Sequence, residues 1–212
     1  MKRFILLLVA TALLGGCATM TTPPASTDSA LVIGVLRIDA SGIGTAPNGA
    51  NGFLNTNVPE NLAVTLQNET TGRVYEVRTE IPSGFFALPN VDPGTYKLVQ
   101  LWAQLKGTDS YFTLISSFDK PPTFDIAAGH VANLGITRWA FAFDLTRTTS
   151  NNSFTFNSDF PNVAAALSRM DAQQGWSGRQ ADQVSFSGQV TATPAVYALP
   201  PRNSAFDRIL LP

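Results

Sequence analysis

The chain has 212 residues, of which 44% are hydrophobic and 14% charged, and its formal net charge is −1 at pH 7. This balance excludes an intrinsically disordered protein, and it offers no basic surface for phosphates, so we expect no nucleic-acid partner. The length suffices for one good hydrophobic core or two small ones.

The N-terminus combines two basic residues with a short apolar segment. Lys2 and Arg3 precede residues 4–16, which carry no charge. This segment is shorter than the about 20 apolar residues that a membrane-spanning helix needs. The pattern therefore predicts a secretory signal peptide over residues 1–16.

Residues Leu14-Gly15-Gly16-Cys17 follow this apolar segment. They resemble the lipobox of bacterial lipoproteins, in which the cysteine is acylated and becomes the mature N-terminus. The resemblance implies that Cys17, the only cysteine, attaches the protein to a membrane through lipid. The alternative is an ordinary signal peptide that happens to contain a cysteine. Ala18 stands where inner-membrane lipoproteins often have Asp, which implies the outer membrane.

The chain after the signal peptide divides into three predicted parts. Residues 18–29 are almost all small, polar or proline, so residues 17–29 are expected to be a lipidated, flexible tether. Residues 30–146 are expected to form a β-sandwich. Residues 147–212 are expected to form a helix and a C-terminal extension packed on it.

Short apolar segments separated by turn residues predict a mainly β protein, an antiparallel β-sandwich. The expected strands are residues 30–39, 61–68, 73–81, 84–88, 95–105, 111–118 and 131–145. The Gly- and Asn-rich residues 41–59 are expected to be a long loop, either an ordinary surface loop or a binding loop.

Residues 95–105 have apolar side chains on both predicted strand faces. Tyr96, Leu98 and Trp102 would lie on one face, and Val99, Leu101, Ala103 and Leu105 on the other. We expect the sandwich core to cover one face and the helix or tail the other. One helix is predicted over residues 159–175, because apolar residues recur there at helical spacing after a capping Asp. Residues 176–212 are expected to form an extended tail with one or two short strands.

Two motifs lie within residues 61–105. They are Gly84-Phe85-Phe86-Ala87-Leu88 and Val91-Asp92-Pro93-Gly94-Thr95-Tyr96-Lys97-Leu98. This region resembles the carboxypeptidase-regulatory-like, or transthyretin-like, β-sandwich domains. The resemblance implies that Phe86 or Phe85, Leu88, Tyr96 and Leu98 lie in the core. It implies no single function, because such domains serve as stalks, adaptors, adhesins and sugar-binding modules.

Few residues could carry catalytic chemistry. His130, the only histidine, is expected at a turn, exposed or capping, and one histidine without a free cysteine makes a zinc site remote. Paired carboxylates for glycoside hydrolysis could come from Asp119, Asp125, Asp144 and Asp159, but a chain with 15 acidic residues offers such pairs by chance. We expect no catalytic residues, no metal, no cofactor and no enzyme activity.

Aromatic residues are the remaining candidates for ligand contact. Trp139, Phe141 and Phe143 share one predicted strand face, where they either form core or stack on sugar rings. Trp176, in a Gly- and Ser-rich stretch, is expected to be exposed and is the better candidate. Two functions follow. One is a non-catalytic, lipid-anchored envelope protein that docks another envelope protein or has a structural role; the other is a lipid-anchored carbohydrate-binding module.

Overall fold

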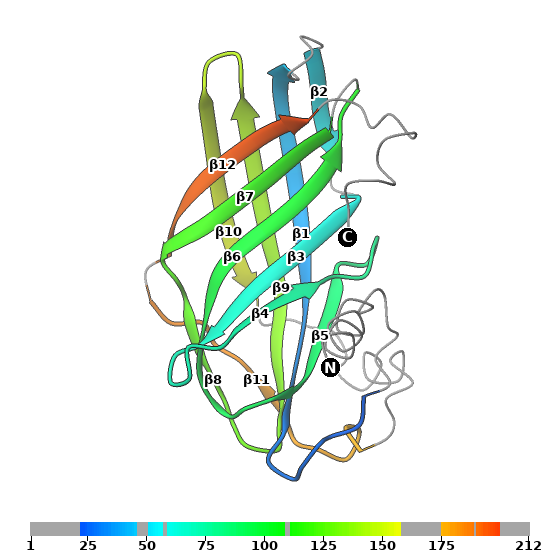
Figure 1. Cartoon of the computed structure of the whole chain (residues 1–212), viewed down its shortest axis with the longest axis vertical. Coiled ribbons are helices and arrows are strands. Elements are labelled where there is room, and N and C mark those ends of the chain that lie inside the picture. Colours follow the sequence, from blue (N-terminus) through cyan, green and yellow to red (C-terminus); the bar gives the residue numbers. More distant parts are fainter. Residues whose placement is uncertain are drawn as a thin grey trace, which may run out of the picture.

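The computed structural model describes residues 22–45, 51–56, 59–108, 111–157, 175–188 and 190–199. They form two six-stranded sheets, which lie face to face with their strands oblique to one another (Figure 1). The predicted mainly β class is therefore confirmed. The expected signal peptide, Cys17 and residues 159–174 of the expected helix lie outside the described residues.

The first sheet is built around two long neighbouring strands. Its strand order is β10-β9-β1-β2, with β5 also paired to β1 and β11 also paired to β9. The bounds are β1 (Ala30–Thr45), β2 (Asn51–Thr56), β5 (Phe85–Val91), β9 (Val131–Asp144), β10 (Thr149–Asn157) and β11 (Ala181–Gln183).

The second sheet has the order β12-β7-β6-β3-β4, with β8 paired to β6. The bounds are β3 (Asn61–Asn68), β4 (Val74–Arg78), β6 (Gly94–Lys106), β7 (Tyr111–Lys120), β8 (Thr123–Ile126) and β12 (Thr191–Leu199). All seven predicted strands are thus present. β2, β8 and β10 come from segments for which the sequence predicted no strand.

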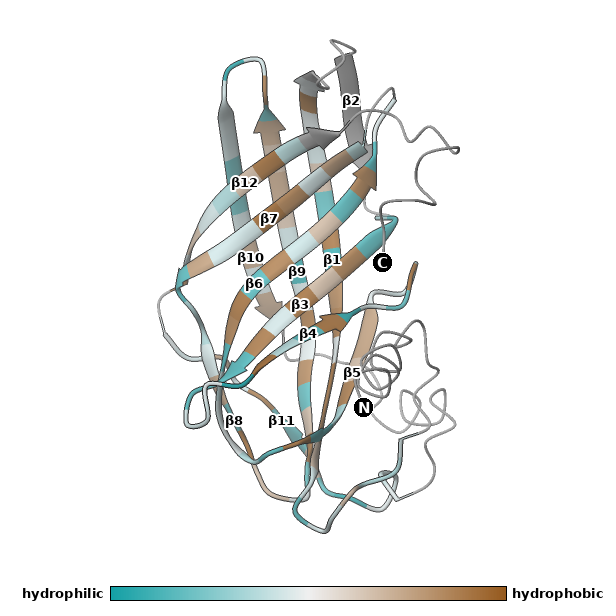
Figure 2. Ribbon diagram, in the orientation of Figure 1, coloured by the Kyte–Doolittle hydropathy of each residue, from teal (hydrophilic) through white to brown (hydrophobic). Residues whose placement is uncertain are grey.

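The hydrophobic core lies between the sheets. Strand β7 shows the alternation that produces it, because every second residue from Phe112 to Phe118 is buried. Figure 2 shows the same alternation as brown and pale bands along the strands. Of the core residues that the family resemblance implied, Phe86, Tyr96 and Leu98 are buried, and Leu88 is partly buried against them. The Tyr96 hydroxyl donates to the Asp92 carbonyl oxygen at 2.8 Å, and burial raises its pKa to about 12.

The predicted all-antiparallel pairing is wrong for the first sheet. Strands β1 and β9 run parallel from Leu31 opposite Val131 to Ile43 opposite Asp144, and β11 is also parallel to β9. Parallel neighbours need a long crossover connection. Here most strands of the second sheet lie between β1 and β9 in the chain. The hydrophobic pattern of a single strand does not reveal which distant strand it pairs with, or in which direction.

The predicted loop over residues 41–59 is also wrong in part. Strand β1 continues to Thr45 and pairs with β2, so residues 41–45 and 51–56 form two antiparallel strands. The glycines that suggested a loop have another cause. A Cβ atom at Gly42 would lie 2.5 Å from the Phe143 ring, so glycine is needed in this strand because an aromatic ring packs on its backbone.

Most of the apolar residues that were assigned to two opposite faces of residues 95–105 point into the same core. Thr65 pairs with Gln100 and Leu66 with Leu98, so Val99 is an extra residue, a β-bulge. A bulge of one residue reverses the alternation of every side chain that follows. As a result Leu101, Ala103 and Leu105 are buried in the same core as Tyr96 and Leu98. Val99 and Trp102 are only half-buried.

The chain beyond residue 146 contributes to both sheets. Strand β10 forms an edge of the first sheet along β9, and β12 pairs with β7 along its whole length. The prediction of one or two short strands in residues 176–212 is met by β11 and β12. Strand β12, however, belongs to the sheet itself rather than to a tail.

Gly94 begins β6 with φ of 137°, a conformation that disfavours other residues. We expect Gly94→Val to lower the free energy of unfolding by roughly 1–3 kcal/mol. Only Asn68 Nδ2, at 3.5 Å, lies near the new Cβ, so the cost comes from backbone strain rather than a clash. Urea unfolding of both proteins measures it. Gly178→Val is the control, because nothing lies within 4 Å of a Cβ there; equal losses in both variants would contradict the strained turn.

Candidate functional site

The N-terminal residues 22–29 lie against one end of the sandwich, beside residues 175–182 (Figure 1). We call this contact the N-terminal docking site and define it by residues 22–29 with Asn90, Trp176 and Arg179. Its geometry shows how the chain that precedes β1 is held to the fold.

Trp176 is fully buried in this site. Its indole Nε1 donates a hydrogen bond to the Thr22 carbonyl oxygen at 2.9 Å. The Arg179 guanidinium lies over the ring, 4.9 Å from its centroid. The predicted exposure of Trp176 is therefore wrong, and no ring face is left for a sugar. The flanking Gly and Ser residues suggested an open loop, whereas the partner of the indole is 154 positions away in the chain.

Arg179 binds the backbone of the N-terminal segment. Its guanidinium donates to three carbonyl oxygens: Ser26 at 2.8 Å, Thr27 at 3.0 Å and Ser29 at 2.5 Å. Its Nε also donates to the Gly175 carbonyl at 3.3 Å. A planar guanidinium with five donors suits this task, because one side chain reaches several acceptors in a fixed fork.

Asn90 and the segment before β9 hold the rest of residues 22–29. The Ala25 amide donates to Asn90 Oδ1 at 2.7 Å, and Asn90 Nδ2 donates to the Pro23 carbonyl at 3.1 Å. The Gly129 amide donates to the Asp28 carbonyl at 2.9 Å. For residues 22–29 the predicted flexible tether is therefore wrong. Composition alone suggested a tether, but distant donors bind the backbone of these residues, and the Ser26 and Ser29 side chains add hydrogen bonds within the segment.

His130 lies beside this site and pairs with a carboxylate. Its Nδ1 is 2.5 Å from Asp182 Oδ2, and Gln180 donates to Asp182 Oδ1 at 2.9 Å. The hydrogen bond with His130 is the main cause that lowers the pKa of Asp182. The expectation that His130 is exposed or capping is thus incomplete, because this half-buried side chain, which directly precedes β9, pairs with Asp182 on β11.

The other predicted ligand residue, Trp139, lies in the hydrophobic core. Trp139 is fully buried, and Phe141 and Phe143 are buried beside it. The Trp139 and Phe141 rings meet edge to face at 5.4 Å. The core alternative therefore applies to this strand. The Trp139 Nε1 is buried without a hydrogen-bond partner among the described residues, so the core carries the cost of an unsatisfied donor there.

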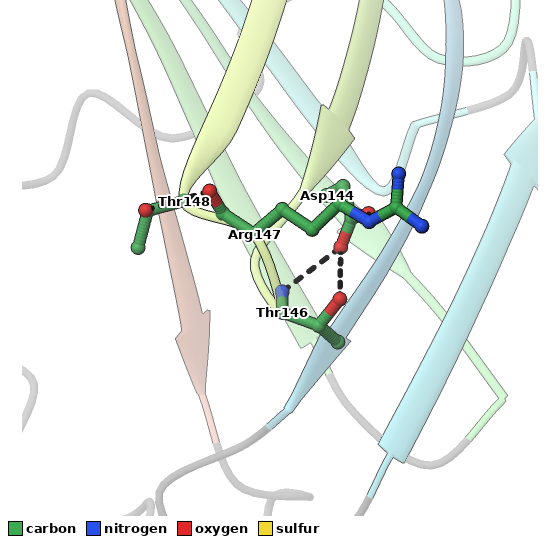
Figure 3. Close-up of polar contacts among 4 residues, drawn as sticks. All are labelled: Asp144, Thr146, Arg147 and Thr148. Carbon is green, nitrogen blue, oxygen red and sulfur yellow. Dashed lines mark hydrogen bonds and ion pairs between the residues drawn. The ribbon is translucent and has the colours of Figure 1, made fainter.

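Three of the four carboxylates considered for glycoside hydrolysis lie in the described residues, and each of these three binds a threonine. Asp125 accepts from Thr95, and Asp119 accepts from Thr193. Figure 3 shows Asp144 accepting from the amide and hydroxyl of Thr146 in the β9–β10 turn. The hydroxyl bond is the main cause that lowers the pKa of Asp144. Asp159 lies outside the described residues.

No three His, Cys, Asp or Glu side chains in the described ranges are grouped as ligands for a metal ion. Within the same ranges there is no helix of the length and apolarity that crossing a membrane requires. Comparison with known proteins found no matching family model, no matching curated protein and no matching solved structure.

The docking site predicts that Arg179→Gln releases residues 25–29. Loss of a hydrogen bond to a charged group costs about 1.5–3 kcal/mol, so amide hydrogen exchange in this segment should become at least about tenfold faster. Arg147→Gln is the matched control, since Arg147 is 82% exposed and pairs with Asp144 at the β9–β10 turn. Unchanged exchange in Arg179→Gln would show that Arg179 does not hold the segment.

The Asp182 carboxyl predicts a dependence of stability on pH. Its pKa is lower in the folded state than in the unfolded chain, so its contribution is present above about pH 4. That contribution is lost as pH falls through the folded pKa. We therefore expect Asp182→Asn to be less stable than the native chain at pH 7 and nearly as stable at low pH. Urea unfolding across this range measures the difference; a gap independent of pH would be contrary to the expectation.

Proposed function

We propose that the protein is a non-catalytic, lipid-anchored cell-envelope protein, held by Cys17 in the outer membrane, whose β-sandwich docks another envelope protein or has a structural role. The signal-like residues 1–16 and the lipobox-like residues 14–17 support the anchor. The main structural support for this arrangement is the N-terminal docking site, because it holds residues 22–29, which follow Cys17 closely in the sequence, against one end of the sandwich.

The docking site limits how far the domain can stand from a lipid at Cys17. The Thr22 carbonyl oxygen already accepts a hydrogen bond from Trp176, and Thr22 is five positions after Cys17 in the chain. A fully extended chain spans about 3.3–3.6 Å per residue, so this distance is at most about 18 Å. The end of the sandwich that carries residues 22–29 would therefore lie next to the membrane surface, and the opposite end would face away from it.

We further propose that the sandwich is of the carboxypeptidase-regulatory-like, transthyretin-like kind. The support is the sequence motif of residues 83–98. Within it, Gly94 has a positive φ and Tyr96, two residues later, is buried. Such domains serve as stalks, adaptors, adhesins and sugar-binding modules, so this resemblance does not choose among these roles. The carbohydrate-binding alternative loses its two named rings, because Trp139 and Trp176 are both buried.

The non-catalytic part of the proposal rests on the single imidazole. His130 pairs with Asp182, which also binds Gln180, so the contacts of the imidazole hold the residue before β9 to β11. Turnover of an envelope glycan, peptide or lipid ester by the purified protein would overturn this part of the proposal.

We expect Cys17→Ser to abolish fatty-acid labelling and to move the protein from the membrane to the soluble fraction. Because Cys17 is the only cysteine, labelling reports on one residue. Ala18→Asp is the companion variant: by the lipoprotein resemblance it should remain lipidated but stay in the inner membrane. Continued labelling of Cys17→Ser would refute the anchor. Crosslinking of the lipidated native protein in whole envelopes then tests for a protein partner.

A further inference from the structure

A cavity of about 270 Å³ lies beside the middle of β1. Strand β5 pairs with β1 only as far as Val35, and β2 pairs with it only from Ala40 onward. Residues 36–39 therefore have no strand neighbour on that side, and Figure 1 shows β5 and β2 beside different parts of β1. We call this cavity, bordered by residues 36–39, the β1 groove.

Two arginines lie next to one another at the groove. Arg37 on β1 is the register neighbour of Arg138 on β9, and both side chains are exposed. Neither guanidinium forms a hydrogen bond or ion pair with a described residue. Like charges at neighbouring positions of a sheet repel one another. An anion bound between the two guanidinium groups would reduce this repulsion.

Asp39 sets the charge of the site. It lies two residues from Arg37 on the same face of β1 and also lines the groove. Asp39 forms no ion pair with either arginine in the described structure. Two arginines and one aspartate leave a formal charge of +1, which complements a monoanion better than a phosphate ester with about −1.5 to −2.

Apolar side chains line one part of the groove. Pro59 is buried, Ile81 is half-buried, and Pro82 is exposed at the groove. These side chains offer no hydrogen bond to a ligand, and they suit a short hydrocarbon chain. The volume lies just below the about 300 Å³ at which ordinary ligand pockets begin, so the ligand must be small.

We propose that the β1 groove binds a small carboxylate with an apolar tail. Arg37 and Arg138 receive the carboxylate, for which planar guanidinium forks have matching geometry. The tail lies against Pro59, Ile81 and Pro82. This binding is separate from lipid attachment at Cys17, and the protein can have either property without the other.

Titration of the purified full-length chain with hexanoate, followed by thermal unfolding and calorimetry, tests the proposal. We expect saturable binding of hexanoate and a rise in melting temperature. 1-Hexanol, which has the same tail without the charge, should bind at least tenfold more weakly, and acetate should also bind weakly. Hexyl phosphate distinguishes the two anion classes and should bind less tightly than hexanoate.

Arg37→Gln and Arg138→Gln should each weaken hexanoate binding at least tenfold. Without ligand, each variant should melt at the same temperature as the native chain or higher, because repulsion is removed. Arg147→Gln, a distant exposed arginine, should bind hexanoate normally. Equal binding of hexanoate and 1-hexanol, tighter binding of hexyl phosphate, or unchanged binding in both arginine variants would overturn the proposal. If a variant fails to fold, the comparison of hexanoate with 1-hexanol on the native chain still decides it.

Discussion

Strands β1 and β9 pair in parallel from Leu31 to Ile43. This pairing determines at which end of the first sheet each strand begins. Parallel strands begin at the same end of a sheet. The segments that precede β1, β9 and β11 therefore meet at one end of the sandwich, and β5, which is antiparallel to β1, finishes there. As a result, residues 22–29, which precede β1, lie beside residues 175–180, which precede β11, and beside Asn90 near the end of β5. Gly129, which precedes β9, also binds this segment.

Backbone carbonyls carry most of the contacts in that site, and this explains why composition could not reveal it. Residues 22–29 are small and polar, as a flexible linker would be. Their backbone carbonyls are acceptors that any sequence supplies, and the donors are the side chains of Arg179, Trp176 and Asn90. The Ser26 and Ser29 hydroxyls add hydrogen bonds within the segment. The donors lie 65 or more positions away in the chain. A linker becomes ordered here because of residues outside it.

The local parts of the fold were predictable and the non-local parts were not. Strand 61–68 matches β3 residue for residue, because its apolar pattern and flanking turns are local. Gly94 follows Asp92-Pro93 between β5 and β6 and has a positive φ, a conformation that glycine adopts at no steric cost. The bulge at Val99 depends on the register with Leu66, and the strand glycine at Gly42 depends on the Phe143 ring. The Trp176 candidate failed because burial is set by distant contacts.

A second bulge connects the core to the proposed ligand site. Ile33 pairs with Asn133, but Val35 pairs with Ile136, so β9 holds one extra residue near Gly135, which has φ of 68°. That residue reverses the alternation of the rest of β9. Trp139, Phe141 and Phe143 consequently face the core, and Arg138 faces outward beside Arg37. Without the bulge the same strand would bury Arg138 and expose three aromatic rings, so one inserted residue determines both the packing of the sandwich and the charge beside the β1 groove.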